Sequence, residues 1–149
     1  MEDQVVVSVV VAAPAEAVFA ALTEPSQLEV WWGAEHGVSG LRWEMDARLG
    51  GRWRSTGEDE SCGAWELSGE VIAFDPPRAI ALTWQEHVTY RPAMGPAVVR
   101  YDLEPAEGGT RVTVTHSGFA GHPAPLASYR EGWPVVLRSL ARHFAAVVV

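Results

Sequence analysis

Three side chains of this sequence are candidates for acid/base chemistry: His116, Tyr101 and Glu86. His116 continues the alternation of Val112 and Val114, so its imidazole is expected on their side of a strand. A histidine or carboxylate beside a phenol could move a proton in a cyclase, dehydratase or aldol-type reaction. A single inward histidine is more often a hydrogen-bonded core residue than a catalyst, so packing is favoured over catalysis for His116.

The chain contains seven tryptophans, more than a protein of this length usually carries. Aromatic side chains could line a ligand cavity, because they supply large apolar area and an indole donor that fixes orientation. They could equally fill a packed core, and Trp31 and Trp32 are assigned mainly to packing. The candidate ligand-binding residues are the side chains expected on the covered side of the fold: Trp53, Trp65, Trp84, Tyr101, His116, Tyr129 and Trp133.

No metal site and no cofactor are expected. The remaining histidines, at positions 36, 87, 122 and 143, have neither the helical nor the strand spacing of metal ligands. The sequence has no lysine, which excludes Schiff-base catalysis and a lysine-anchored phosphate loop. It also lacks a nucleophile elbow and a dinucleotide-binding turn. The single cysteine, Cys62, can form no disulfide within the chain.

The charge balance disfavours nucleic acid and anionic membrane surfaces as partners. Eleven basic residues, all arginine and not clustered, stand against 19 acidic ones, for a net charge of −8. The sequence opens Met1-Glu2-Asp3, which is acidic where a secretory signal would be basic, and the apolar run over residues 5–13 is too short to span a bilayer. We therefore expect a cytoplasmic protein without membrane insertion.

The first third of the chain predicts a strand followed by two short helices. Alternating valines over residues 5–9 predict a strand that ends at residues 12–13. Pro14 suits the first position of a helix, and the apolar residues after it repeat at helical spacing. Pro25 ends that helix, and a second one is expected to end at residues 31–32.

Residues 38–117 have a hydrophobic period of two, interrupted by glycine and proline pairs. This pattern predicts an antiparallel meander of about six strands with one covered and one solvated face. An apolar helical stripe from Tyr129 to Phe144 would provide the cover, and Pro134 allows a kink or a late start there. With no repeat or linker visible, the sequence predicts one domain over residues 1–149. Its fold class is α+β, a helix-grip arrangement in which a curved antiparallel sheet of six to seven strands wraps around a long C-terminal helix.

An ordered set of short motifs covers nearly the whole chain. Each is weak alone, but together they are specific for a fold: residues 13–22, 31–32, 50–53, 75–78, 83–84, 108–116 and 132–133. In this order they resemble the START-related helix-grip (SRPBCC) superfamily. Within it, the sequence is similar to the branch of the activator of heat-shock-protein-90 ATPase.

The resemblance implies a cavity between sheet and long helix that holds a small hydrophobic molecule, such as a lipid or polyketide. Binding of an apolar or aromatic ligand is therefore the favoured function. A polyketide cyclase or aromatase acting through His116, Tyr101 or Glu86 is the enzymatic alternative, and a cofactor of a chaperone ATPase acting through its surface is the third. The chain is too short for the extra chaperone-binding domain of the eukaryotic activator, so a chaperone partner is not expected. Sheet edges and exposed tryptophans are compatible with a homodimer.

Overall fold

The computed structural model of the chain describes residues 4–32, 38–59, 63–88 and 91–145. The predictions for His36 and Cys62 lie outside these residues. The chain runs through one strand, two short helices, six further strands and a long helix: β1 (Gln4–Val11), α1 (Ala15–Thr23), α2 (Pro25–Trp31), β2 (Val38–Met45), β3 (Arg52–Asp59), β4 (Gly63–Asp75), β5 (Ala79–Val88), β6 (Arg91–Ala106), β7 (Gly109–Ser117) and α3 (Pro123–Ala145).

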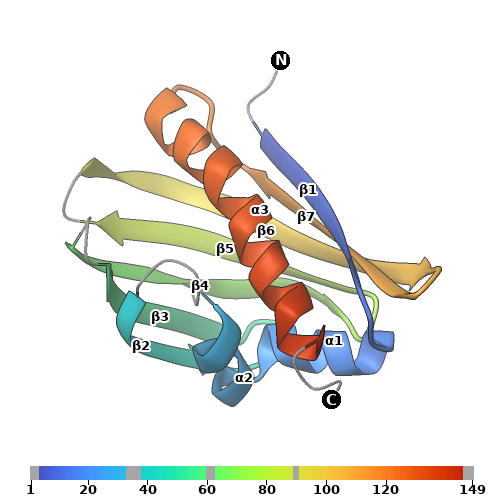
Figure 1. The fold of residues 1–149 in the computed structure, drawn as a ribbon. Helices are drawn as coiled ribbons and strands as arrows, with labels where there is room; N and C mark the ends of the chain where they lie inside the picture. Colours follow the sequence, from blue (N-terminus) through green and yellow to red (C-terminus); the bar gives the residue numbers. More distant parts are fainter. Residues whose placement is uncertain (1–3, 33–37, 60–62, 89–90, 146–149) are drawn as a thin grey trace.

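The seven strands form one antiparallel sheet in the order β1-β7-β6-β5-β4-β3-β2. Strands β2 to β7 form a meander in which each strand pairs with the next. The first strand, β1, pairs with the last, β7, and forms one edge of the sheet. Figure 1 shows α3 lying across one face of the curved sheet, with α1 and α2 near the C-terminal end of α3. The predicted α+β helix-grip class is therefore confirmed.

The two short helices follow from their local sequence. Pro14 is the N-cap of α1, Glu16 lies in its first turn where the helix dipole favours an acid, and Val18 and Leu22 face the core. Pro25 opens α2 at a position where its missing N–H costs no helical hydrogen bond. The first strand ends at Val11, one or two residues earlier than predicted, and α2 ends at Trp31, within the predicted end at residues 31–32.

Helix α3 buries one stripe against the sheet, with Trp133, Val136, Leu137 and Leu140 inside. Pro134 lies in the interior of this helix, which begins at Pro123, so the alternative of a late start was wrong. A proline removes only one backbone donor, and the apolar stripe on either side of it is long enough to keep the helix on the sheet. No helix in the described ranges is long and apolar enough to cross a membrane.

A side chain replaces part of the hydrogen-bond ladder between β4 and β5. Gly69 and Glu70 pair with β3 but have no partner in the β5 register. Instead the Trp53 indole Nε1 donates to the Thr83 carbonyl oxygen at 2.9 Å, and the Glu70 amide donates to the Thr83 hydroxyl at 2.8 Å. The indole crosses the sheet over Gly69, where a Cβ atom would lie 1.8 Å from the Thr83 oxygen. Only glycine fits at this position without displacing its neighbours.

Candidate functional site

A group of buried polar side chains lies between α3 and the inner face of the sheet. Glu86 of β5 is only 3% exposed, and its carboxylate accepts a hydrogen bond from the Tyr129 hydroxyl of α3. The Trp84 indole Nε1 donates to the same hydroxyl at 3.2 Å. The three side chains therefore form a chain of hydrogen bonds in which the indole donates to the phenol and the phenol donates to the carboxylate. We call these residues, with His116 and Trp133, the Glu86 cluster.

His116 is fully buried on β7, and its hydrogen bond fixes its tautomer. The Trp133 indole Nε1 donates to His116 Nδ1 at 3.0 Å, so Nδ1 is an acceptor and the proton resides on Nε2. Burial lowers the pKa of His116 to about 3, so the imidazole is neutral at pH 7. Within the described residues no acceptor lies in hydrogen-bonding distance of Nε2.

Ring contacts join His116 to the rest of the cluster. The centroid of its imidazole lies 4.4 Å from that of Tyr129 in an edge-to-face arrangement and 4.6 Å from that of Phe119. Phe119 was not among the predicted site residues, because it follows Gly118 beyond the end of β7, where no strand alternation indicates its direction. The imidazole is therefore held by aromatic faces as well as by its hydrogen bond.

A cluster of indoles extends the buried surface from β5 toward β2. Trp53 lies 4.6 Å from Trp84 and is stacked on Trp43 at 5.5 Å, centroid to centroid. Trp32, assigned to packing from sequence, contacts both Trp43 and Trp84, at 5.2 and 5.9 Å. Trp43 was not among the predicted site residues, although its alternation with Arg42 and Glu44 could have placed it on the covered face.

The structure brings most of the predicted site residues together. Tyr101 is buried with its ring 6.0 Å from Trp133, and burial raises the pKa of its hydroxyl. Trp65 is half-buried near the start of β4, and no ring contact joins it to the other tryptophans in the described part of the chain. The remaining predicted residues all belong to the Glu86 cluster or touch it: Trp53, Trp84, Glu86, His116, Tyr129 and Trp133.

The hydrogen-bonding state of the indoles limits what they could offer a ligand. Trp53, Trp84 and Trp133 each use their N–H within the protein, and they can present only their apolar faces. The Trp43 N–H is buried without an acceptor among the described residues. Polar recognition would therefore involve the Glu86 carboxylate as acceptor and the His116 Nε2–H as donor.

In the described ranges, no three histidine, cysteine or acidic residues lie close enough together to hold a metal ion.

The sequence profile of the AHSA1 family, described as Activator of Hsp90 ATPase homolog 1-like protein, matches residues 12–145. The chain belongs to this family. The match includes all of the Glu86 cluster, both short helices and six of the seven strands in full. No curated protein is significantly similar to the chain in sequence.

Several solved structures share the fold over almost the whole chain. The AHSA1 protein of Silicibacter pomeroyi is 27% identical, with a TM-score of 0.76 and coverage of 96% of this chain and 98% of its own. A protein of Mesorhizobium loti is 23% identical, with a TM-score of 0.78 and coverage of 98% and 99%. DynU16, a protein of the dynemicin biosynthetic locus, is 23% identical with a TM-score of 0.72, and the match covers 96% of this chain but 47% of DynU16.

Proposed function

We propose that this protein binds a small apolar or aromatic molecule between α3 and the inner face of the sheet, with the Glu86 cluster at the polar end of the site. The observation that carries the proposal is the buried carboxylate of Glu86, which accepts a hydrogen bond from the Tyr129 phenol, whose ring in turn packs against the neutral imidazole of His116. Burial of a carboxylate is unfavourable, and a core selected for stability alone would hold apolar side chains of similar size there. Buried polar groups beside aromatic faces are typical of small-molecule sites.

The chemistry of the cluster defines what the ligand would present. The indole faces of Trp84 and Trp53 offer large, flat apolar area, which suits a ring system or an extended hydrocarbon. The carboxylate oxygens of Glu86 accept hydrogen bonds, so they would favour a ligand hydroxyl or enol. His116, neutral at pH 7, would donate from Nε2 to a ligand oxygen.

Native mass spectrometry of protein purified from its own host tests the proposal. We expect an additional mass that is present under gentle conditions and lost on denaturation. Glu86→Gln and Tyr129→Phe should lower the occupied fraction severalfold, whereas Arg111→Gln, an exposed change on β7, should leave it unchanged. A clean apo mass, together with no saturable binding of apolar fluorescent probes or lipid extracts, would contradict ligand binding.

A cyclase- or dehydratase-like activity on a polyketide-like substrate is the second candidate. It is favoured by the direct hydrogen bond between Tyr129 and Glu86, an acid/base pair already in contact, and by the shared fold of DynU16. Because the pKa of His116 is lowered to about 3, His116 would position a carbonyl rather than act as a base at neutral pH. Turnover of an identified substrate should fall strongly in Glu86→Gln. Unchanged turnover in that variant would exclude Glu86 as the base.

A further inference from the structure

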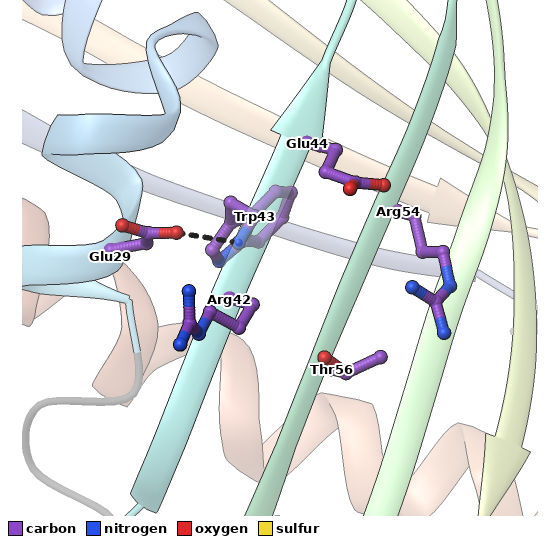
Figure 2. Close-up of a pocket in the computed structure, with 6 residues that line it drawn as sticks. All are labelled: Glu29, Arg42, Trp43, Glu44, Arg54 and Thr56. Carbon is purple, nitrogen blue, oxygen red and sulfur yellow. Dashed lines mark hydrogen bonds between the residues drawn. The ribbon is translucent and has the colours of Figure 1, made fainter.

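A polar hollow of about 240 Å³ lies over β2 and β3, away from the Glu86 cluster. Figure 2 shows its lining: Glu29, Arg42, Trp43, Glu44, Arg54 and Thr56. The side chains of Trp43, Trp53 and Ser55 are buried on the inner face of the sheet. The other lining residues of β2 and β3 alternate with these three, so their side chains lie on the outer face.

The register of the two strands sets the arrangement of charges. Arg42 lies directly opposite Thr56, and Glu44 lies directly opposite Arg54. The Arg54 Nε lies 3.0 Å from the Glu66 carboxylate on β4. This hydrogen bond, and to a smaller extent the charge of Glu44 across the strands, raises the pKa of Arg54. This ion pair holds Arg54 at the far side of the hollow, as Figure 2 shows.

Helix α2 closes the other side of the hollow. The Glu29 carboxylate accepts a hydrogen bond from the Trp43 backbone N–H at 3.0 Å, shown as the dashed line in Figure 2. This bond uses an outward-facing amide of β2, the edge strand of the sheet. It therefore fixes the position of Glu29 beside Arg42.

Two charged side chains at the hollow form no close ion pair among the described residues. Neither the Arg42 guanidinium nor the Glu44 carboxylate takes part in an ion pair or side-chain hydrogen bond there. Arg42 and Glu44 lie two residues apart on one face of β2, and their Cα atoms are roughly 7 Å apart along the strand. A cation and an anion at this separation present opposite charges to a single small molecule.

We propose that the hollow binds a small zwitterionic amino acid. Its carboxylate would lie on the Arg42 guanidinium and the Thr56 hydroxyl, and its ammonium group on the carboxylate of Glu44. A simple anion fits less well, because two glutamates line the hollow and the chain has a net charge of −8. The volume suits a molecule of amino-acid size. This site is independent of the proposed interior ligand.

Titration of isotope-labelled protein, followed by the amide signals of β2 and β3, tests the site. The probes are γ-aminobutyrate and two matched molecules that each lack one charge, butyrate and butylammonium, at about 20 mM salt, where screening is weak. We expect saturable shifts with γ-aminobutyrate and binding at least about tenfold weaker for either single-charge probe, a loss of roughly 1.4 kcal/mol.

Variants assign the two ends of the ligand. Arg42→Gln and Glu44→Gln should each weaken γ-aminobutyrate binding about two- to fivefold, the loss expected for one exposed charge contact. Arg111→Gln, exposed on β7, should not change it. All three changes are on the surface, and unchanged unfolding midpoints would confirm that the fold is intact.

Three results would overturn the proposal. The first is butyrate binding as tightly as γ-aminobutyrate, which would indicate a plain anion site. The second is an unchanged affinity for γ-aminobutyrate in Arg42→Gln, and the third is no saturable shift at any probe concentration. None of these outcomes bears on the interior site, whose test is the mass of a co-purified ligand.

Discussion

At the scale of single residues, hydrogen bonds between α3 and the sheet define the interior. Tyr129 donates to Glu86, Trp84 donates to Tyr129, and Trp133 donates to His116. Each of these hydrogen bonds except that from Trp84 to Tyr129 and that from Tyr129 to Glu86, which share one hydroxyl, has its own donor and acceptor, and all three join α3 to a strand. A buried donor or acceptor that loses its partner destabilises the fold. These contacts therefore fix the rotation and height of α3 over the sheet, and with them the shape of any site beneath it.

The buried imidazole of His116 predicts a specific pH dependence of stability. Its pKa is about 3 in the folded protein and near 6.5 in the unfolded chain, so between these values the unfolded chain binds more protons. The free energy of unfolding should therefore decrease as pH falls below about 6.5, by up to about 1.4 kcal/mol per pH unit from this group. Urea unfolding of the wild type and His116→Gln between pH 4 and 7 should show a smaller slope in the variant.

The matched control for this prediction is His122→Gln, because His122 is exposed. It should retain the wild-type slope while carrying the same chemical change. Equal slopes in the wild type and His116→Gln would show that His116 takes up a proton in the folded state.

The Tyr129 hydroxyl predicts coupling between helix and sheet. Tyr129→Phe leaves the buried Glu86 carboxylate without this donor and should lower the free energy of unfolding by about 2 kcal/mol. In Glu86→Gln the same Tyr129→Phe change should cost less, because the bond is then to a neutral acceptor. A double-mutant cycle measured by urea unfolding gives the coupling energy, and additive effects would mean that the hydrogen bond contributes nothing measurable.

The sequence could indicate the side to which these residues point, but not which of them meet. Strand alternation placed Trp84, Glu86 and His116 on the covered face, and all three are buried. The partners come from a helix more than a dozen residues away in sequence, and helical spacing alone does not set the height at which Tyr129 lies over β5. Trp43 was not among the predicted site residues, although the alternation of β2 indicates the same face.

At the scale of elements, the gap in the ladder between β4 and β5 depends on one glycine. A Cβ atom at Gly69 would lie 1.8 Å from the Thr83 carbonyl oxygen and 2.6 Å from the Trp53 Nε1. These two atoms are hydrogen-bonded to each other. Gly69→Ala should therefore lower the free energy of unfolding by about 3 kcal/mol or more and shift the tryptophan fluorescence.

Gly132 provides the control for this prediction. It lies inside α3, and a Cβ atom added there would meet no neighbouring atom within 4 Å, so Gly132→Ala should raise the free energy of unfolding by about 1 kcal/mol. Urea unfolding of both variants separates crowding from backbone entropy. A Gly69→Ala protein as stable as the wild type would show that Trp53 can leave Thr83 without loss.

Elements were predicted more completely than their irregularities. The order of strands and helices follows from hydrophobic period and turn residues, and the structure agrees with it throughout the described ranges. The gap at Gly69 could not be predicted, because the donor that fills it belongs to a third strand. Pro134 was given too much weight, since the cost of one proline is smaller than the burial of the stripe around it.

At the scale of the whole molecule, the charged side chains other than Glu86 lie outside and most aromatic side chains inside, within the described residues. The arginines whose burial the structure describes are all exposed, and ion pairs such as Arg54–Glu66 and Arg100–Asp102 are on the surface. Exposed pairs each contribute at most about 1 kcal/mol. The excess of acidic groups acts over the whole surface, and its repulsion opposes folding.

This balance predicts that salt stabilises the protein. Raising the ionic strength from about 20 to about 200 mM at pH 7 shortens the screening length and should increase the free energy of unfolding by about 0.5 to 1 kcal/mol. The gain in the free energy of unfolding should be the same in sodium chloride and choline chloride, which would exclude stabilisation by binding of a specific cation. It should vanish near the isoelectric point of about 5.0, where the net repulsion is absent. Loss of stability with salt at pH 7 would instead mean that the surface ion pairs outweigh the repulsion among the acidic groups.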